Sequence, residues 1–137
     1  MTRKGDPVTI QHERQVDAAE VVRELIEAAF RGDVAAATAL CTPDIVMRME
    51  GTDEVHGHEG VTQLIEFNEE FATGIRVEIH GVLAAGDTAA LHRTTHLTIG
   101  GQQLALAVGS FFTLRDGLVC EWSDYQDMGE VFRALGH

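Results

Sequence analysis

The stretch Leu114-Arg-Asp-Gly-Leu-Val-Cys-Glu-Trp-Ser-Asp-Tyr-Gln-Asp127 carries the clearest local signal in the chain. Its Asp116-Gly117 dipeptide favours a tight hairpin turn, because such turns need residues that tolerate positive φ angles. The residues after the turn are mostly apolar or aromatic, as is typical of a strand. The stretch therefore predicts a strand over residues 118–125 that returns antiparallel to the strand before it.

Two more turn signals precede this stretch, Gly86-Asp87 and Gly100-Gly101, and all three lie at the spacing expected of successive hairpins. The segments between and around the turns each have the length of one strand. The second half of the chain therefore predicts an antiparallel sheet, with strands over residues 75–83, 88–98, 103–114 and 118–125.

The first half is mostly helical in pattern. Apolar residues recur at helical spacing over residues 18–30, which predicts an amphipathic helix that ends at Gly32. Asp33 can cap a second short helix, and Thr42-Pro43-Asp44 is expected to stop it.

Three further elements complete the prediction. Apolar and polar residues alternate over residues 45–50, as expected of a strand with one face toward the interior. A loop over residues 51–60 leads to a third helix, which reaches residue 71. A last helix is expected over residues 128–135, with Gly136 just past its end.

Helices followed by antiparallel strands predict an α+β fold in which the sheet curls around the N-terminal helices. The length of 137 residues suits one domain. We expect a flexible N-terminal segment over residues 1–14, because it has no periodic pattern, and a single domain over residues 15–137.

Composition limits the partners of this domain. Ten Lys and Arg residues against 22 Asp and Glu residues give a net charge of -12, which would repel nucleic acid and anionic lipid. The chain shows no membrane-spanning apolar stretch and no signal peptide pattern, so we expect a cytoplasmic location and no membrane contact. Cys41 and Cys120 lie far apart and are expected to be buried apolar residues rather than a disulfide or metal ligands.

The opening stretch, followed by a short helix ending at Leu135-Gly136, resembles the closing strands of the nuclear transport factor 2-like superfamily, in its SnoaL-like and limonene-1,2-epoxide hydrolase-like branch. The order of the predicted elements agrees with that superfamily. The resemblance implies a cone-shaped, cystatin-like α+β roll. It also implies an apolar pocket between the curved sheet and its helices that takes a small hydrophobic molecule.

The limonene epoxide hydrolase family uses two aspartates joined by an arginine, and a tyrosine and an asparagine that help to hold the attacking water. The resemblance assigns Asp124 and Arg93 to the first aspartate and the arginine. Thr95 stands where the second aspartate is expected, and Met47 and Met49 stand where the tyrosine and the asparagine are expected. This chain thus has no second carboxylate to protonate an opening epoxide.

The alternation of side chains along a strand predicts which neighbours share a face with Arg93 and with Asp124. Arg93 should share a face with Leu91, Thr95 and Leu97, and Asp124 should share one with Cys120 and Trp122. A carboxylate in such apolar surroundings can act as a general base. The alternative is a buried ion pair between Asp124 and Arg93 that does no chemistry. Arg93 would orient and supply charge in either case, because it does not lose its proton near neutral pH.

Substrate-binding walls are expected from residues that share the inner face of the sheet. The candidates are mostly apolar, and two of them are flexible methionines that suit an irregular ligand. They are Met47, Met49, Thr95, Leu97, Leu106, Val108 and Trp122.

The spaced histidines do not predict a metal site. His56 and His58 lie in a glycine-rich loop, and His92 and His96 share a strand face opposite Arg93, so neither pair converges on the expected pocket. We therefore expect no metal and no cofactor. A ketosteroid isomerase-like oxyanion hole is also disfavoured, because Tyr125, next to Asp124, should face the other side of the sheet.

The sequence favours a cofactor-independent enzyme with hydrolase, isomerase or polyketide cyclase chemistry on a hydrophobic substrate. The alternative is a non-catalytic carrier or sensor that kept the pocket and lost the chemistry. A purely structural interaction domain is a third interpretation. We also expect a homodimer formed through the outer face of the sheet, because that face would otherwise expose a patch of apolar residues: Ala90, Ala105, Ala107, Phe111 and Val119.

Overall fold

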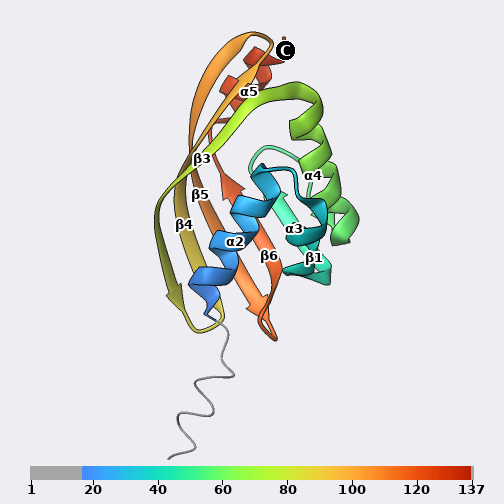
Figure 1. Ribbon diagram of the computed structural model, residues 1–137, viewed down its shortest axis with the longest axis vertical. Coiled ribbons are helices and arrows are strands. Elements are labelled where there is room, and N and C mark those ends of the chain that lie inside the picture. Colours follow the sequence, from blue (N-terminus) through green and yellow to red (C-terminus); the bar gives the residue numbers. More distant parts are fainter. Residues whose placement is uncertain (1–16, 137) are drawn as a thin grey trace, which may run out of the picture.

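The computed structural model describes residues 17–136, so the segment expected over residues 1–14 lies outside the described part of the chain. Within the described residues, a six-stranded curved sheet lies against four helices (Figure 1). The elements in chain order are α2 (Ala18–Phe30), α3 (Val34–Ala39), β1 (Cys41–Met49), β2 (Val55–His56), α4 (Gly57–Phe71), β3 (Ala72–Ala85), β4 (Thr88–Ile99), β5 (Gln102–Arg115), β6 (Leu118–Tyr125) and α5 (Met128–Ala134).

Helix α2 forms where the sequence predicts it. The Asp17 side chain accepts a hydrogen bond from the backbone N–H of Ala19 at 3.0 Å and so satisfies one of the free donors at the helix start. Its inner face, with Val22, Leu25 and Ile26, is fully buried against the sheet. Gly32, at φ 82°, then turns the chain toward α3, a conformation that glycine adopts without strain.

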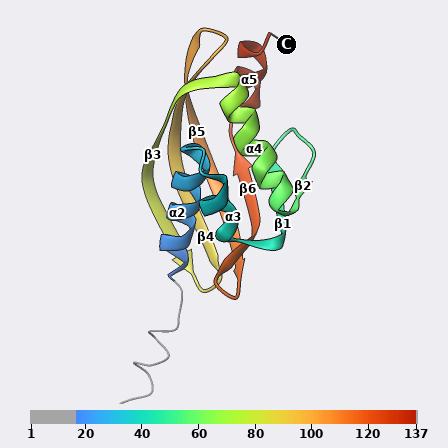
Figure 2. The same cartoon turned by 45° about the vertical axis from the view of Figure 1, so that its right-hand side comes forward.

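The sheet has the strand order β2-β1-β6-β5-β4-β3. The β3–β4, β4–β5 and β5–β6 pairs are antiparallel, as the three turn signals predict. Strand β1 adds to β6 in parallel, a pairing that the sequence patterns do not indicate. The sheet bends around α2, α3 and α4, which all lie on its concave side in both views (Figure 2).

Strand β1 begins at Cys41, earlier than the predicted residue 45. The Thr42-Pro43-Asp44 segment does not break the chain, because it lies where β1 leaves its register with β6: Cys41 pairs with Val119, and the next pair is Val46 with Glu121. A proline is tolerated at such an irregular position because no ladder hydrogen bond is lost.

The loop expected over residues 51–60 is shorter in the structure. Residues Val55–His56 form β2, which pairs antiparallel with Val46 and Met47 of β1. Helix α4 then begins directly at Gly57, before the predicted helix start.

A bulge in β6 changes which residues face inward. Thr113 pairs with Glu121 and Leu114 with Val119, so Cys120 is an extra residue without a partner of its own on β5. As a result, Val119 is fully buried in the core, and its expected place on the outer face is wrong. Cys120 is only half-buried and does not share the inner face with Trp122.

The core is divided into two apolar clusters. On β4, Leu91 belongs to the larger cluster under α2 and Ile99 to the smaller one under α5, and Arg93 and Thr95 lie between them. On β5, Ser110 separates Phe112 from Val108 in the same way. Buried polar residues therefore interrupt the core at one level of the sheet.

Candidate active site

The Arg93 and Asp124 side chains contact each other where the buried polar residues interrupt the apolar core. Arg93 Nη2 donates to Asp124 Oδ2 at 3.0 Å, and their side chains are only 1% and 3% exposed. They come from β4 and β6, which are separated by β5, and both point to the concave side of the sheet. An ion pair this deeply buried needs further hydrogen bonds to offset the loss of water.

The other guanidinium nitrogens of Arg93 are also bonded. Nε donates to Thr95 Oγ1 at 3.1 Å, and Nη1 donates to Ser110 Oγ. The Phe30 ring lies against the guanidinium, with its centroid 4.7 Å from Arg93 Cζ, a distance at which a cation is attracted to an aromatic face. Within residues 17–136, these contacts use three of the five N–H groups of Arg93.

Asp124 accepts two more hydrogen bonds at its second oxygen. Ser110 Oγ donates to Oδ1 at 2.6 Å, and Trp122 Nε1 donates to the same atom at 2.6 Å. An ionised carboxylate offers about four acceptor positions. From the described part of the chain, three are filled, and the open one is on Oδ2.

A cavity of about 250 Å³ opens beside this pair. Arg93, Thr95 and Asp124 contribute polar surface, together with Thr52, Asn68 and Gln126. The rest of the lining is apolar and comes from both the sheet and the helices: Phe30, Met49, Leu64, Phe67, Leu97, Ile99, Leu106, Met128, Val131, Phe132 and Leu135. The arrangement is an apolar pocket with one charged pair at its wall, which is typical of small-molecule sites.

Helix α5 lies next to the β4–β5 turn (Figures 1 and 2), and its residues Met128, Val131 and Phe132 line the cavity. The turn and the helix approach closely: a Cβ atom on Gly100 would lie 2.7 Å from the backbone oxygen of Ala134. Gly100 also has φ 59°, so no other residue fits this position without strain. The close packing of α5 on this turn therefore requires a glycine at position 100, although Gly100 does not itself line the cavity.

The expected substrate-binding residues divide into two groups. Met49, Thr95, Leu97 and Leu106 line the cavity. Met47, Val108 and Trp122 do not line it: each is almost fully buried in an apolar cluster, and Trp122 reaches the site only through its hydrogen bond to Asp124.

Ser110 is the member of the network that the sequence-based prediction missed. It is the single hydroxyl residue on the inner face of β5, among Leu104, Leu106, Val108 and Phe112. A lone serine on an otherwise apolar buried face requires a hydrogen-bond partner, and that exception to the pattern was the available signal. Asn68 and Gln126 were missed as well, because both come from outside the strands to which side-chain alternation applies.

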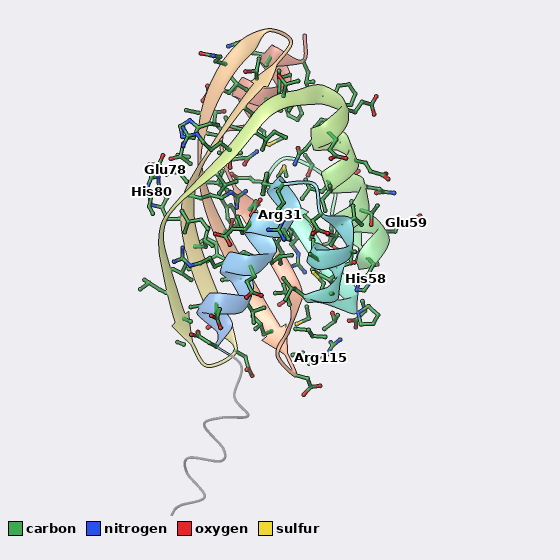
Figure 3. The ribbon with its side chains drawn as sticks, viewed as in Figure 1. Arg31, His58, Glu59, Glu78, His80 and Arg115 are labelled. Atoms are coloured by element: carbon green, nitrogen blue, oxygen red, sulfur yellow. The ribbon has the colours of Figure 1, made fainter. Side chains whose placement is uncertain are left out.

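The histidines lie away from this cavity. The His80 and His92 rings lie against each other with centroids 4.8 Å apart, and His96 pairs with Glu78 at 3.2 Å. Glu78 and His80 project from β3 on the side that faces away from the helices (Figure 3). His58 lies on α4, where Nε2 contacts the backbone oxygen of Cys41 at 3.0 Å. Among residues 17–136, no group of three or more potential metal ligands comes together.

The thiols are held in their neutral form. Burial raises the pKa of Cys41 to about 12, and burial also raises the pKa of Cys120. A nucleophilic cysteine needs the opposite shift, because the thiolate is the reactive species. Neither residue lines the cavity.

The fold and the site together define an α+β cone with an apolar pocket and a buried Asp–Arg pair. A family model described as the SnoaL-like domain matches residues 22–122, and the chain belongs to this SnoaL-like family. The expected fold and family are therefore confirmed. Within the described residues, no helix has the length and hydropathy required to cross a bilayer.

A curated relative is Epoxide hydrolase EphG of Mycobacterium tuberculosis (strain ATCC 25618 / H37Rv), which is 28% identical over 92 residues. This match covers 67% of the chain, and the chain spans only 61% of the length of that relative. A solved structure of an M. tuberculosis LEH-like epoxide hydrolase is similar with a TM-score of 0.72 and 26% identity, over 86% of this chain and 88% of that one.

Two more distant structures support the fold alone. An NTF2-like protein of unknown function from Burkholderia pseudomallei K96243 has a TM-score of 0.80 at 20% identity, over 90% of this chain and 100% of that one. A putative polyketide cyclase from Xanthomonas campestris pv. campestris has a TM-score of 0.75 at 20% identity, over 86% of this chain and 96% of that one.

Proposed function

We propose that this protein is a cofactor-independent enzyme that uses Asp124 as a general base on a small hydrophobic substrate, and that its reaction is the hydrolysis of an epoxide. The observation that carries the proposal is the open acceptor position on Asp124 Oδ2, at the wall of a largely apolar cavity. The similarity to epoxide hydrolase of M. tuberculosis, in both sequence and structure, adds support. A cavity of about 250 Å³ suits a compact ligand, since sites for drug-sized molecules measure roughly 300–1,000 Å³.

In this reaction, Asp124 Oδ2 takes a proton from a bound water molecule. The water oxygen forms a bond to one epoxide carbon, the ring C–O bond breaks, and its electron pair stays on the ring oxygen as an alkoxide. The remaining N–H groups of Arg93 stabilise the alkoxide, because their positive charge is fixed in place before the reaction. The proton held by Asp124 then returns to the alkoxide through solvent and completes the diol.

The lack of a second carboxylate favours isomerisation or cyclisation as a second candidate function. Thr95 occupies that position, and its hydroxyl accepts a hydrogen bond from Arg93 Nε. A threonine hydroxyl is a much weaker acid than a carboxylic acid, so Thr95 does not protonate a leaving oxygen as a second carboxyl group would. Isomerisation or cyclisation needs only a base and a stabilised oxyanion, which Asp124 and Arg93 could supply.

The test is turnover of small epoxides such as cyclohexene oxide, styrene oxide and limonene oxide in water enriched in ¹⁸O. Hydrolysis by this site gives a diol with one labelled oxygen, and Asp124→Asn gives none above the uncatalysed rate. Binding of these epoxides without any diol would instead support the carrier alternative. Conversion to a ketone or an allylic alcohol would support the isomerase.

We also infer that the outer face of the sheet contacts a second copy of the chain. Leu83 is 78% exposed and Phe111 is 52% exposed, and both line a hollow of about 440 Å³ that includes Ala84 and Ala90. Exposed apolar side chains around one hollow are unusual on a free surface. A two-fold contact would bury this face against itself, away from the cavity.

A further inference from the structure

The Arg93, Ser110 and Asp124 side chains form a closed triangle of hydrogen bonds. Arg93 bonds to Ser110, Ser110 bonds to Asp124, and Arg93 bonds to Asp124. Ser110 is fully buried and does not line the cavity, whereas Arg93 and Asp124 do. The triangle therefore joins two residues of the pocket wall to one residue behind it.

The direction of the Ser110 hydroxyl follows from its partners. A guanidinium can only donate, so Ser110 Oγ must accept from Arg93 Nη1. The single hydroxyl proton of Ser110 is then left to point at Asp124 Oδ1, 2.6 Å away. Arg93 thus fixes the orientation of a hydroxyl that would otherwise rotate.

The same bond helps to fix the plane of the Asp124 carboxylate. Ser110 and Trp122 both donate to Oδ1 from behind the cavity wall, and they fill its two acceptor positions. Oδ2 accepts only from Arg93 among the described residues, so it keeps the open position. The two oxygens of a carboxylate are equivalent, so a half-turn restores the same arrangement. A partial rotation would turn the open position away from the cavity, and the two short donors to Oδ1 oppose it.

We propose that Ser110 is a positioning residue that locks the Asp124 carboxylate with Oδ2 toward the cavity. It touches no ligand and acts through Asp124. This role rests on Asp124 being the reactive group of the proposed function, but its consequence for binding holds even without turnover. A ligand that donates a hydrogen bond to Oδ2 should bind better than a matched ligand that cannot.

Cyclohexanol and cyclohexyl methyl ether form such a matched pair. Both oxygens can accept from Arg93, but only the alcohol can donate to Asp124 Oδ2. We expect the unmodified protein to bind the alcohol about tenfold more tightly than the ether in calorimetric or NMR titrations. In Ser110→Ala, this preference should fall to within about twofold, because Oδ1 then keeps only the Trp122 donor and the carboxylate plane can rotate.

Catalysis should change in the same variant. We expect kcat for an epoxide to fall by about tenfold or more in Ser110→Ala with KM little changed, because the apolar contacts of the substrate are untouched. Ser110→Cys is the second variant: it keeps the buried volume, and its S–H is a weak donor. It should behave like Ser110→Ala, and it takes the place of the alanine variant in both experiments if that variant does not fold.

The two proposals can fail separately. If the unmodified protein hydrolyses no epoxide but shows the alcohol preference, and Ser110→Ala removes it, the proposed reaction is wrong and the role of Ser110 stands. If both Ser110 variants fold and keep the alcohol preference, Ser110 does not position Asp124. An unchanged kcat in both variants, when the unmodified enzyme is active, would also exclude this role for Ser110.

Discussion

Trp122 and Asp124 lie two residues apart on β6, and the indole N–H of Trp122 donates to Asp124 Oδ1 over 2.6 Å. The same ring packs against Phe112, with centroids 5.9 Å apart, and is fully buried. One side chain thus belongs to the apolar core and to the polar network. The position of the candidate base is therefore coupled to the packing of the core.

Asp124→Asn should abolish turnover, because an amide has the same shape as the carboxylate but cannot accept the proton of water. It should also destabilise the fold by about 1.5–3 kcal/mol, since Arg93 Nη2 loses a charged acceptor. Steady-state diol formation and urea unfolding measure the two effects. An active Asp124→Asn variant would exclude Asp124 as the base.

A single-turnover experiment distinguishes a base from a nucleophile at Asp124. With enzyme in excess in ¹⁸O-water, a base mechanism places the label in the diol of the first turnover. A carboxylate nucleophile would instead deliver its own unlabelled oxygen to that diol. We expect labelled diol from the first turnover, as determined by mass spectrometry of the product.

Arg93→Leu should destabilise the protein by roughly 3–5 kcal/mol, because it leaves the buried Asp124 carboxylate without its partner. The double variant Arg93→Leu/Asp124→Leu should be more stable than Arg93→Leu alone, since no buried charge remains. Chemical unfolding of the four proteins of this cycle checks the prediction. Additive effects would mean that the two side chains do not interact.

Thr95→Asp should increase epoxide hydrolysis. Thr95 lines the cavity and bonds to Arg93 Nε at 3.1 Å, so a carboxyl group there would lie beside Arg93 and, in its protonated form, supply the missing acid. Thr95→Asn is the matched control, because it has the same shape as aspartate and cannot donate an acidic proton. Equal rates for the two variants would show that an acid at this position is not limiting.

Phe111→Glu should produce a monomer. Phe111 packs edge-on against Tyr125 with ring centroids 5.7 Å apart on the outer face, and a charge there would be buried in the inferred contact. Light scattering should report twice 14.9 kDa for the unmodified protein and 14.9 kDa for the variant. A monomeric unmodified protein at micromolar concentration would contradict the inferred contact.

Cys41 should resist alkylation in the folded protein. Burial raises its pKa from 9.0 to about 12, so the thiolate is rarer in the folded state than in the unfolded state. Its stabilising contribution is full below pH 9.0 and is lost as the pH rises toward 12. The stability difference between the unmodified protein and Cys41→Ala should therefore shrink above pH 9.0. Urea unfolding at several pH values measures it, and a difference that does not vary with pH would count against this shift.

Much of the fold could be predicted from the sequence because its signals are local. Asp116-Gly117 and the two earlier turns fix the hairpins, and the antiparallel strands follow from them. The parallel pairing of β1 with β6 was not predictable in this way, because it joins segments that lie far apart in the chain. Side-chain alternation also has no means of showing an inserted residue such as Cys120.

For the site, alternation brought Arg93 and Asp124 to one face, and the structure has them in contact. The bulge did not disturb this result, because it precedes Trp122 and leaves the last part of β6 in register with β5. The roles of both residues stay predictions. Met47, Val108 and Trp122 share the inner face with the cavity walls but are packed into the apolar clusters, and a two-residue period carries no information on which inward side chains are covered by their neighbours.

The extra residue at Cys120 gives β6 two independent halves. Val119 and Trp122 are three residues apart and would face opposite sides of an unbroken strand. The extra residue lets Val119, Trp122 and Asp124 all face the inner side. Deletion of Cys120 would leave Val119 and Trp122 two residues apart, and regular alternation would then keep Val119, Trp122 and Asp124 on the inner face. In evolutionary terms, the segment between Val119 and Trp122 can lose one residue without moving the candidate base from the inner face, whereas the two-residue spacing from Trp122 to Asp124 has no bulge to compensate for a change in length.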